Sequence, residues 1–259
     1  MSLRNVRTAT VHGARRLALT VGLLALGFAF SAAAEESGAA AEHDPLEPFN
    51  RGMFWFNDQL DVYLLEPVAK GWEWATPKDV RTWLDNFFDN LHAPIDTVNS
   101  MLQGKPGDAG IAMGRFLFNS TVGFAGFFDP ATSELGLEEV REDFGQTLAV
   151  WGLGSGPFLV LPLLGPSSPR DAVGLGVDAA LAVYTWYIPL SATLSSRGTY
   201  VVNSRARLLQ QIEDSKKSSF DYYIFVRNAY LQYRRNLIQD KQAGENGFYD
   251  DLYQVVPGN

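Results

Sequence analysis

The stretch Gly145–Asp171, GQTLAVWGLGSGPFLVLPLLGPSSPRD, decides how this chain is interpreted. It carries no charge before Arg170, and it combines glycines and prolines with the apolar run 158–164. Pro162 lacks a backbone N–H donor, which disfavours a central position in a sheet. The run is also too short to cross a bilayer as a helix. We therefore expect a bent apolar hairpin that is either enclosed by helices or dipped partly into lipid.

The amino terminus reads as an export signal. Residues 1–16 contain four arginines and no acid, residues 17–30 are apolar, and Ser31 is followed by three alanines. A basic region, a short apolar region and an Ala-x-Ala site, in that order, are typical of a secretory signal peptide. We expect residues 1–34 to be removed by cleavage after Ala34. The alternative is an amino-terminal membrane anchor.

Charge and cysteine content exclude several classes of function. Four of the 21 basic residues lie in the signal, so the remainder carries 17 basic against 29 acidic residues, a formal charge of −12. Such a protein has no electrostatic attraction to nucleic acid or to anionic lipid head groups. The chain contains no cysteine, which excludes disulfides, thiol catalysis and cysteine-ligated metals.

The mature chain divides into a linker at 35–43, a folded domain at 44–240 and a loose tail at 241–259. Within the domain, apolar residues recur at three- and four-residue steps, which predicts an all-α fold. The glycine-aromatic stretch 121–129 predicts a close backbone approach or a shallow apolar surface. The expected helices run from 44 to about 66, from 76 through at least 88, over 94–103, 108–120 and 172–190, and over 201–212 and 220–237 around a break at Ser218-Ser219.

The last two apolar stripes favour core packing, although their tyrosines and arginines also suit a membrane–water boundary. The apolar stretch 172–190 contains Asp178 and three helix-disfavouring residues, Gly174, Gly176 and Pro189. Because a carboxylate is costly in hydrocarbon, we expect this helix to lie in or beside a bilayer and not to span it.

Few residues could support catalysis. Glu142 and Asp143 could act as a hydrolase's carboxylate pair, but the solvated start of a helix is the favoured interpretation. His92 could bind a metal with Asp89 or Asp96, although a packed histidine near a helix end is favoured. The glycines at 152–156 match neither a nucleophile elbow nor a dinucleotide loop. We expect no enzyme activity, no metal and no cofactor.

Long blocks of the chain resemble the MlaA (VacJ) family of outer-membrane phospholipid transport components. The resemblance covers about residues 44–240. Its blocks are Asp44–Arg51, Asn57-Asp58, Pro67–Ala69, Asn86–Leu91, Val98-Asn99, Leu102–Lys105, Arg115-Phe116, Asn119–Thr121, Glu142–Leu148, Trp151-Gly152, Gly156-Pro157, Leu161–Ser167 and Arg170-Asp171.

The resemblance implies an all-helical, ring-like (doughnut) protein in the inner leaflet of an outer membrane. A central amphipathic channel would pass misplaced outer-leaflet phospholipids to a soluble periplasmic MlaC-like carrier, and a trimeric porin would hold the ring. Family members are commonly lipoproteins, whereas this chain has no cysteine to acylate. Its anchoring would then depend on the apolar faces of the ring or on the porin, and a looser periplasmic protein is the alternative.

The apolar hairpin is the predicted lipid path, although its leucines could equally fill the core. A polar head group crosses hydrocarbon only at high cost, and an amphipathic path lowers that cost without a covalent step. Two other classes of protein stay open: a structural or interaction protein that moves no lipid, and a carboxylate hydrolase. The predicted path residues are Gly154, Gly156, Phe158, Leu159, Leu161, Leu163 and Leu164.

Overall fold

The computed structural model describes residues 44–240. The expected signal peptide, linker and tail, with His43, lie outside the described residues. The described elements are α2 (Glu47–Leu60), a π-helical segment (Asp61–Leu65), α3 (Glu66–Ala75), α4 (Lys78–Leu102), α5 (Pro106–Thr121), α6 (Pro130–Leu135), α7 (Phe144–Val150), β1 (Leu159–Leu161), β2 (Gly165–Ser167), α8 (Pro169–Leu181), a 3₁₀ turn (Val183–Trp186), α9 (Leu190–Arg207), α10 (Leu209–Ser218) and α11 (Tyr222–Ile238).

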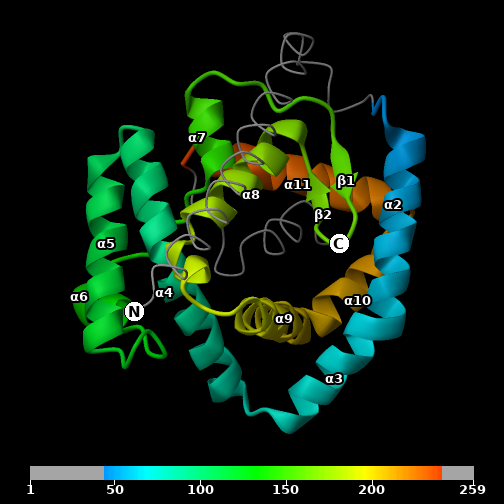
Figure 1. Cartoon of the computed structure of the whole chain (residues 1–259). Coiled ribbons are helices and arrows are strands. Elements are labelled where there is room, and N and C mark those ends of the chain that lie inside the picture. The colour runs from blue at the N-terminus through cyan, green and yellow to red at the C-terminus, as the bar shows by residue number, and fades with distance from the viewer. Residues whose placement is uncertain (1–43, 241–259) are drawn as a thin grey trace, which may run out of the picture.

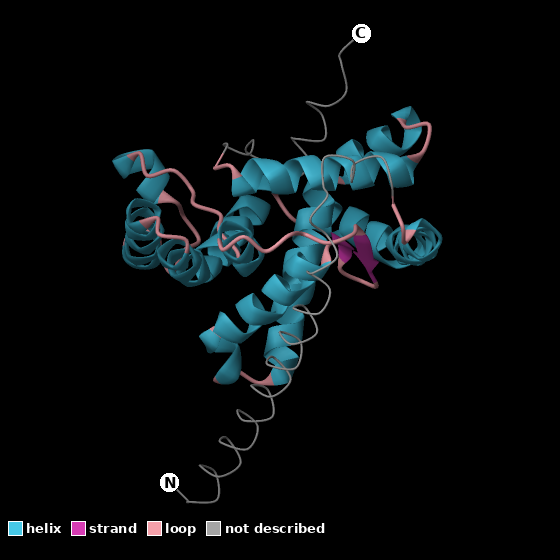
Figure 2. Ribbon diagram, turned by 90° about the horizontal axis from the view of Figure 1, so that it is seen from above, coloured by secondary structure: helices cyan, strands magenta, loops and turns pink. Residues whose placement is uncertain are grey.

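The helices form a ring (Figure 1). The chain runs through α2 and α3 into α4, which packs against α7; α7 contacts α11, α11 contacts β2, and β1 returns to α2. Helices α9 and α10 pack against α3, while α5 and α6 lie on the outer side of α4. Seen from above, the hairpin lies at one side of the ring beside a helix at its edge (Figure 2). The expected all-helical, ring-like assembly is confirmed.

The first helical region continues past Pro67, where the sequence predicted its end. Residues Asp61–Leu65 are π-helical, and α3 begins directly after them with Pro67 in its first turn. A π-helical insertion shifts the hydrogen-bond register, so it can accommodate a residue that has no N–H. The guanidinium of Arg205 also holds Asp61, with Nε–Oδ1 2.7 Å and Nη2–Oδ2 2.9 Å.

Helix α4 passes through Pro94 without ending, so the predicted separate helix at 94–103 is wrong. A proline inside a helix costs about 3 kcal/mol or more. Polar contacts on both sides of it hold α4 to other helices: Asn90 donates to Ser120 on α5, and Asn99 donates to Asp178 on α8. These contacts offset the local cost and tie both halves of α4 to neighbouring helices.

The predicted helix over 172–190 is shorter than expected. Helix α8 ends at Leu181 and is followed by the 3₁₀ turn. Within it, Asp178 is buried. Hydrogen bonds from Asn99 and from the backbone N–H of Phe144 to its carboxylate compensate for the loss of water. Of the helices in the described range 44–240, none is long and apolar enough to cross a membrane.

The carboxyl-terminal helices agree only in part with the sequence prediction: α9 begins at Leu190, well before the predicted start at 201, and the helix is broken again at Leu208. The expected break falls at Ser219, between α10 and α11. Tyr223 and Tyr230 of α11 are buried against Phe158, which confirms the core interpretation for those two tyrosines.

The buried interior is unusually polar for a folded domain. Asn50, Asn99 and Asn203 are each completely inaccessible to solvent. Buried amides are retained only where hydrogen bonds satisfy them, so these positions hold elements together. The largest fully buried side chains are Gln146, Val160, Asn50, Asn99, Asn203, Thr147, Ser100 and Ser168.

Helices α7 and α8 approach closely through glycines, which gives a matched pair of variants. A Cβ at Gly174 would lie 2.3 Å from the backbone nitrogen of Gly145, whereas a Cβ at Gly176 on the same helix meets nothing within 4 Å. We expect Gly174→Ala to lower the thermal midpoint measured by circular dichroism, because backbone atoms must move. Gly176→Ala should be neutral or stabilising, since alanine favours a helix by about 1 kcal/mol. Equal midpoints for the two variants would contradict this packing.

Candidate functional site

The apolar hairpin forms as the sequence predicts. Strands β1 and β2 pair antiparallel, with Leu159 opposite Ser167 and Leu161 opposite Gly165. Pro162 follows the last paired residue of β1, so the ladder loses no donor there. In the turn, Leu163 and Gly165 have positive φ angles of 67° and 81°. The apolar run is therefore a tight, strained turn and not a central strand.

Two asparagines of α2 hold the free edge of β1. Asn50 donates to the carbonyl of Phe158 and accepts from the N–H of Val160, both at 2.9 Å. Asn57 donates to the carbonyl of Leu161 at 2.9 Å and accepts from the N–H of Leu163 at 2.8 Å. Each amide supplies one donor and one acceptor, as a neighbouring strand would. We call these four contacts the amide clamp.

The residues of the predicted lipid path occupy different environments. Phe158 belongs to the aromatic core, and Leu159 and Leu161 are half-buried on β1. At the tip, the side chains of Leu163 and Leu164 are 77% and 63% exposed. The hairpin thus has one end anchored in the protein and an apolar end that is uncovered.

The two glycines of the predicted path precede the hairpin. Gly154 is exposed in the loop after α7. Gly156 has a φ angle of 73°, and a Cβ there would lie 3.1 Å from the ring of Pro169. Gly156 therefore serves the close approach of the hairpin to the start of α8.

Large apolar side chains are uncovered around the ring. Five of the six tryptophans are exposed, and Trp74, at the end of α3, is 90% exposed. Soluble monomers rarely leave such side chains in water, and large uncovered apolar surfaces mark contacts with proteins or membranes. Other exposed examples are Tyr63, Phe124, Tyr187, Leu190 and Phe220.

The glycine-aromatic stretch 121–129 has both predicted properties. A Cβ at Gly126 would lie 2.6 Å from Nδ2 of Asn90, so the backbone approaches α4 closely. Phe124 is 73% exposed and adds to the uncovered apolar surface.

Glu142 and Asp143 each form an ion pair with a different basic side chain. Glu142 is buried, not solvated as predicted, and it accepts from Lys105 at 2.8 Å and Gln103 at 2.7 Å. Burial raises the pKa of Glu142. Burial would also raise the pKa of Asp143, but the charge of Arg234 outweighs it and lowers that pKa. Asp143 also caps α7 through the N–H of Gln146, so both carboxylates have structural partners.

His92 lies in the middle of α4, half-exposed, and not near a packed helix end as predicted. Its Nδ1 lies 3.0 Å from Oδ1 of Asp96. Burial works against the charged ring, but the hydrogen bond and charge of Asp96 raise the pKa of His92 to about 9. Over residues 44–240, no group of three or more histidine and acidic side chains could hold a metal ion.

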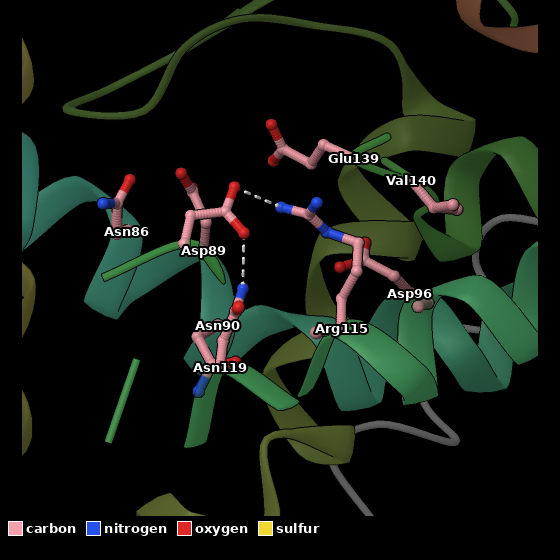
Figure 3. Close-up of a pocket in the computed structure, with 11 residues that line it drawn as sticks. Asn86, Asp89, Asn90, Asp96, Arg115, Asn119, Glu139 and Val140 are labelled. Carbon is pink, nitrogen blue, oxygen red and sulfur yellow. Dashed lines mark hydrogen bonds and ion pairs between the residues drawn. The ribbon is translucent and has the colours of Figure 1, made fainter. Parts of the chain in front are cut away.

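A small polar cavity lies between α4, α5 and the segment that contains Glu139 (Figure 3). Its volume is about 70 Å³, far less than the roughly 300–1,000 Å³ of a typical small-molecule site. Burial, reinforced by the charge of Glu139, raises the pKa of its residue Asp89 to about 7. Apart from the metal hypothesis, sequence reasoning did not single out Asp89.

A family profile described as "MlaA lipoprotein" matches residues 42–237. The chain belongs to the MlaA lipoprotein family. The sequence resemblance is thereby confirmed.

Curated MlaA relatives align over most of their length. The intermembrane phospholipid transport system lipoprotein MlaA of Escherichia coli (strain K12) is 37% identical over 224 residues, 83% of this chain and 86% of that protein. The protein of the same name from Haemophilus influenzae is 34% identical over 220 residues, 83% of this chain and 87% of the relative.

The fold comparison agrees with the MlaA assignment. A solved structure described as the structural basis for maintenance of bacterial outer membrane lipid asymmetry matches with a TM-score of 0.68 at 35% identity. The match covers 76% of this chain and 100% of the other. Within this MlaA-family fold, the amide clamp was missed by sequence reasoning. Its sequence signals are the seven-residue spacing of Asn50 and Asn57, about two helical turns, and the place of both residues in blocks that resemble the family.

The amide clamp predicts that Asn57 restrains the hairpin tip. The chain has no cysteine, so Leu164→Cys can carry a single nitroxide. We expect Asn57→Ala to increase the mobility of that label in electron paramagnetic resonance spectra, because both hydrogen bonds to the tip are lost. Gln59→Ala, on the same helix, should leave the spectrum unchanged. A label that is equally mobile in both variants would contradict the clamp.

The raised pKa of Asp89 predicts a pH-dependent cost to stability. Between the ordinary pKa of 3.8 and about 7, the folded protein holds a proton that the unfolded chain releases. The contribution of protonated Asp89 to the free energy of unfolding is therefore lost as the pH rises through that window. Asp89→Asn should raise the thermal midpoint at pH 8 by several degrees, at about 2–4 °C per kcal/mol, and change it little at pH 4. The exposed Glu134→Gln is the control, and a lower midpoint for Asp89→Asn at pH 8 would refute the prediction.

Proposed function

We propose that this protein is the outer-membrane component of an intermembrane phospholipid transport system that maintains lipid asymmetry. It would give phospholipids misplaced in the outer leaflet an amphipathic path to a periplasmic carrier. Membership of the MlaA family and the names of its curated relatives support the proposal.

The observation that carries the proposal is the distribution of polarity. Asn50, Asn99 and Asn203 are completely buried, while five tryptophans and the leucines of the hairpin tip are exposed. At about 25 cal/mol per Å², the exposed apolar side chains would gain substantially from contact with hydrocarbon. A ring that lies in the inner leaflet of the outer membrane would cover them without a spanning helix. The buried hydrogen bonds would hold it together there, where hydrophobic packing between helices contributes little.

The mechanism is physical and involves no covalent step. Leu163 and Leu164 at the hairpin tip would contact acyl chains, with Gly154, Gly156, Phe158, Leu159 and Leu161 as the remainder of the proposed path. Polar groups of the ring would replace water around the head group. Removal by the carrier sets the direction. An MlaC-like periplasmic carrier and a trimeric porin are the proposed partners, in keeping with the family.

An interaction protein that moves no lipid is the second candidate, because the same exposed apolar surface could contact other proteins. The two candidates differ in whether purified protein speeds phospholipid movement. A hydrolase is disfavoured because Glu142 and Asp143 are committed to Lys105 and Arg234.

Reconstituted transfer tests the proposal. Purified protein in liposomes should accelerate removal of a fluorescent phospholipid by an added MlaC-type carrier, compared with protein-free liposomes. Leu163→Asp should reduce the rate severalfold, because a carboxylate at the tip disfavours acyl chains. Leu135→Asp, an exposed leucine on α6, is the control. Wild-type protein that gives no acceleration would favour the interaction protein, and an unchanged rate for Leu163→Asp would remove the tip from the path.

A further inference from the structure

The polar cavity contains hydrogen-bond acceptors that lack donors. Most of its carboxylates are paired: Asp129 accepts from Arg115 at 2.9 Å and Asn119 at 2.8 Å, and Asp96 contacts His92. Glu139, at the rim, accepts from Arg141 at 2.8 Å. These contacts account for the acidic side chains of the cavity, apart from Asp89.

Asp89 and Asn90 remain without full partners. No hydrogen bond reaches the Asp89 carboxylate from any side chain or backbone group of residues 44–240. Asn90 is 92% buried and its amide donates to Ser120, but its Oδ1 accepts nothing among the described residues. Both residues line the same cavity, as Figure 3 shows. An unpaired acceptor as deeply buried as Asn90 Oδ1 is destabilising, whereas Asp89 is only half-buried.

The missing partner is a donor that carries positive charge. Two acceptors, one of them a carboxylate, call for a group with several N–H or O–H donors. A divalent metal is disfavoured, because no group of three metal-ligating side chains occurs among the described residues. The volume of about 70 Å³ admits only a small group. A primary ammonium, with three donors and one charge, meets these requirements.

Uncovered aromatic rings lie beside the cavity. Trp83 precedes the cavity residue Asn86 by about one turn of α4, and Phe128 directly precedes Asp129. The two rings contact each other with centroids 5.5 Å apart, and both are exposed. Asn86 also donates to the backbone carbonyl of Phe127. A ligand with an ammonium end and an apolar end would satisfy both features, as an aminophospholipid does.

We propose that this cavity binds the primary ammonium head group of an aminophospholipid, with the Asp89 carboxylate as its counter-ion and Asn90 Oδ1 as a neutral acceptor. The inference rests on the proposed function and adds a head-group preference to it. A free primary amine has the same chemistry, so the test must separate the two sources.

A methylation series tests the proposal on the unaltered protein. Binding of phosphatidylethanolamine and its mono-, di- and trimethylated forms would be measured in mixed micelles by native mass spectrometry. Each methyl removes a donor and adds volume, so we expect affinity to fall along the series, by about tenfold overall. Equal affinities for all four lipids would overturn the proposal. Free ethanolamine that displaces the lipid at micromolar concentration would reassign the site to a free amine.

A conservative variant assigns the effect to Asp89. Asp89→Asn keeps the size of the side chain and should abolish the preference for phosphatidylethanolamine over phosphatidylglycerol. Glu134→Gln, an exposed carboxylate of α6, should retain it. An unchanged preference in Asp89→Asn would overturn the assignment. If the wild-type protein transfers phosphatidylglycerol in the liposome assay but shows no preference for phosphatidylethanolamine, only this inference fails. If the wild-type protein transfers neither lipid in that assay, the proposed function itself fails.

Discussion

The ring depends on the pairing of two side-chain amides with the edge of a strand. Helix α2 and the hairpin are about 100 residues apart in sequence, and the side-chain amides of Asn50 and Asn57 join them through four hydrogen bonds to backbone groups of the hairpin. Asn50 is completely buried, so its removal would leave the carbonyl of Phe158 and the N–H of Val160 without this partner. The same contacts position the exposed leucines of the tip. The clamp therefore presents the apolar turn, and it closes the ring together with the ion pairs of Arg51 with Asp221 and of Lys216 with Asp58.

Similar polar contacts recur around the ring. Asn203 of α9 donates to Asp85 of α4 and accepts from Trp72 of α3, each at 2.9 Å. Arg234 of α11 joins Asp143 and Asp171. Directional contacts of this kind fix the relative positions of helices whose apolar faces are turned outward. A ring held together by hydrophobic packing alone would have to bury those faces and could not offer them to lipid.

Local sequence signals identified the hairpin, because Pro162 and the glycines restrict the backbone wherever they occur. They failed at Pro67 and Pro94, where a π-helical segment and partners on other helices outweigh the cost of a proline. The amide clamp and Asp89 could not be predicted securely. An asparagine on a helix has the same local pattern whether it contacts water or a distant strand. Family resemblance supplied the ring, which periodicity alone did not.

Depth-resolved fluorescence quenching tests the central claim, that the apolar outside of the ring lies in one leaflet. The protein would be reconstituted with phospholipids brominated at different positions along the acyl chain, and quenching of its tryptophans recorded. Five of the six tryptophans are exposed, so we predict strong quenching, greatest for bromines near the head group and weak for those at the bilayer centre. Quenching that is absent at every depth would contradict the account.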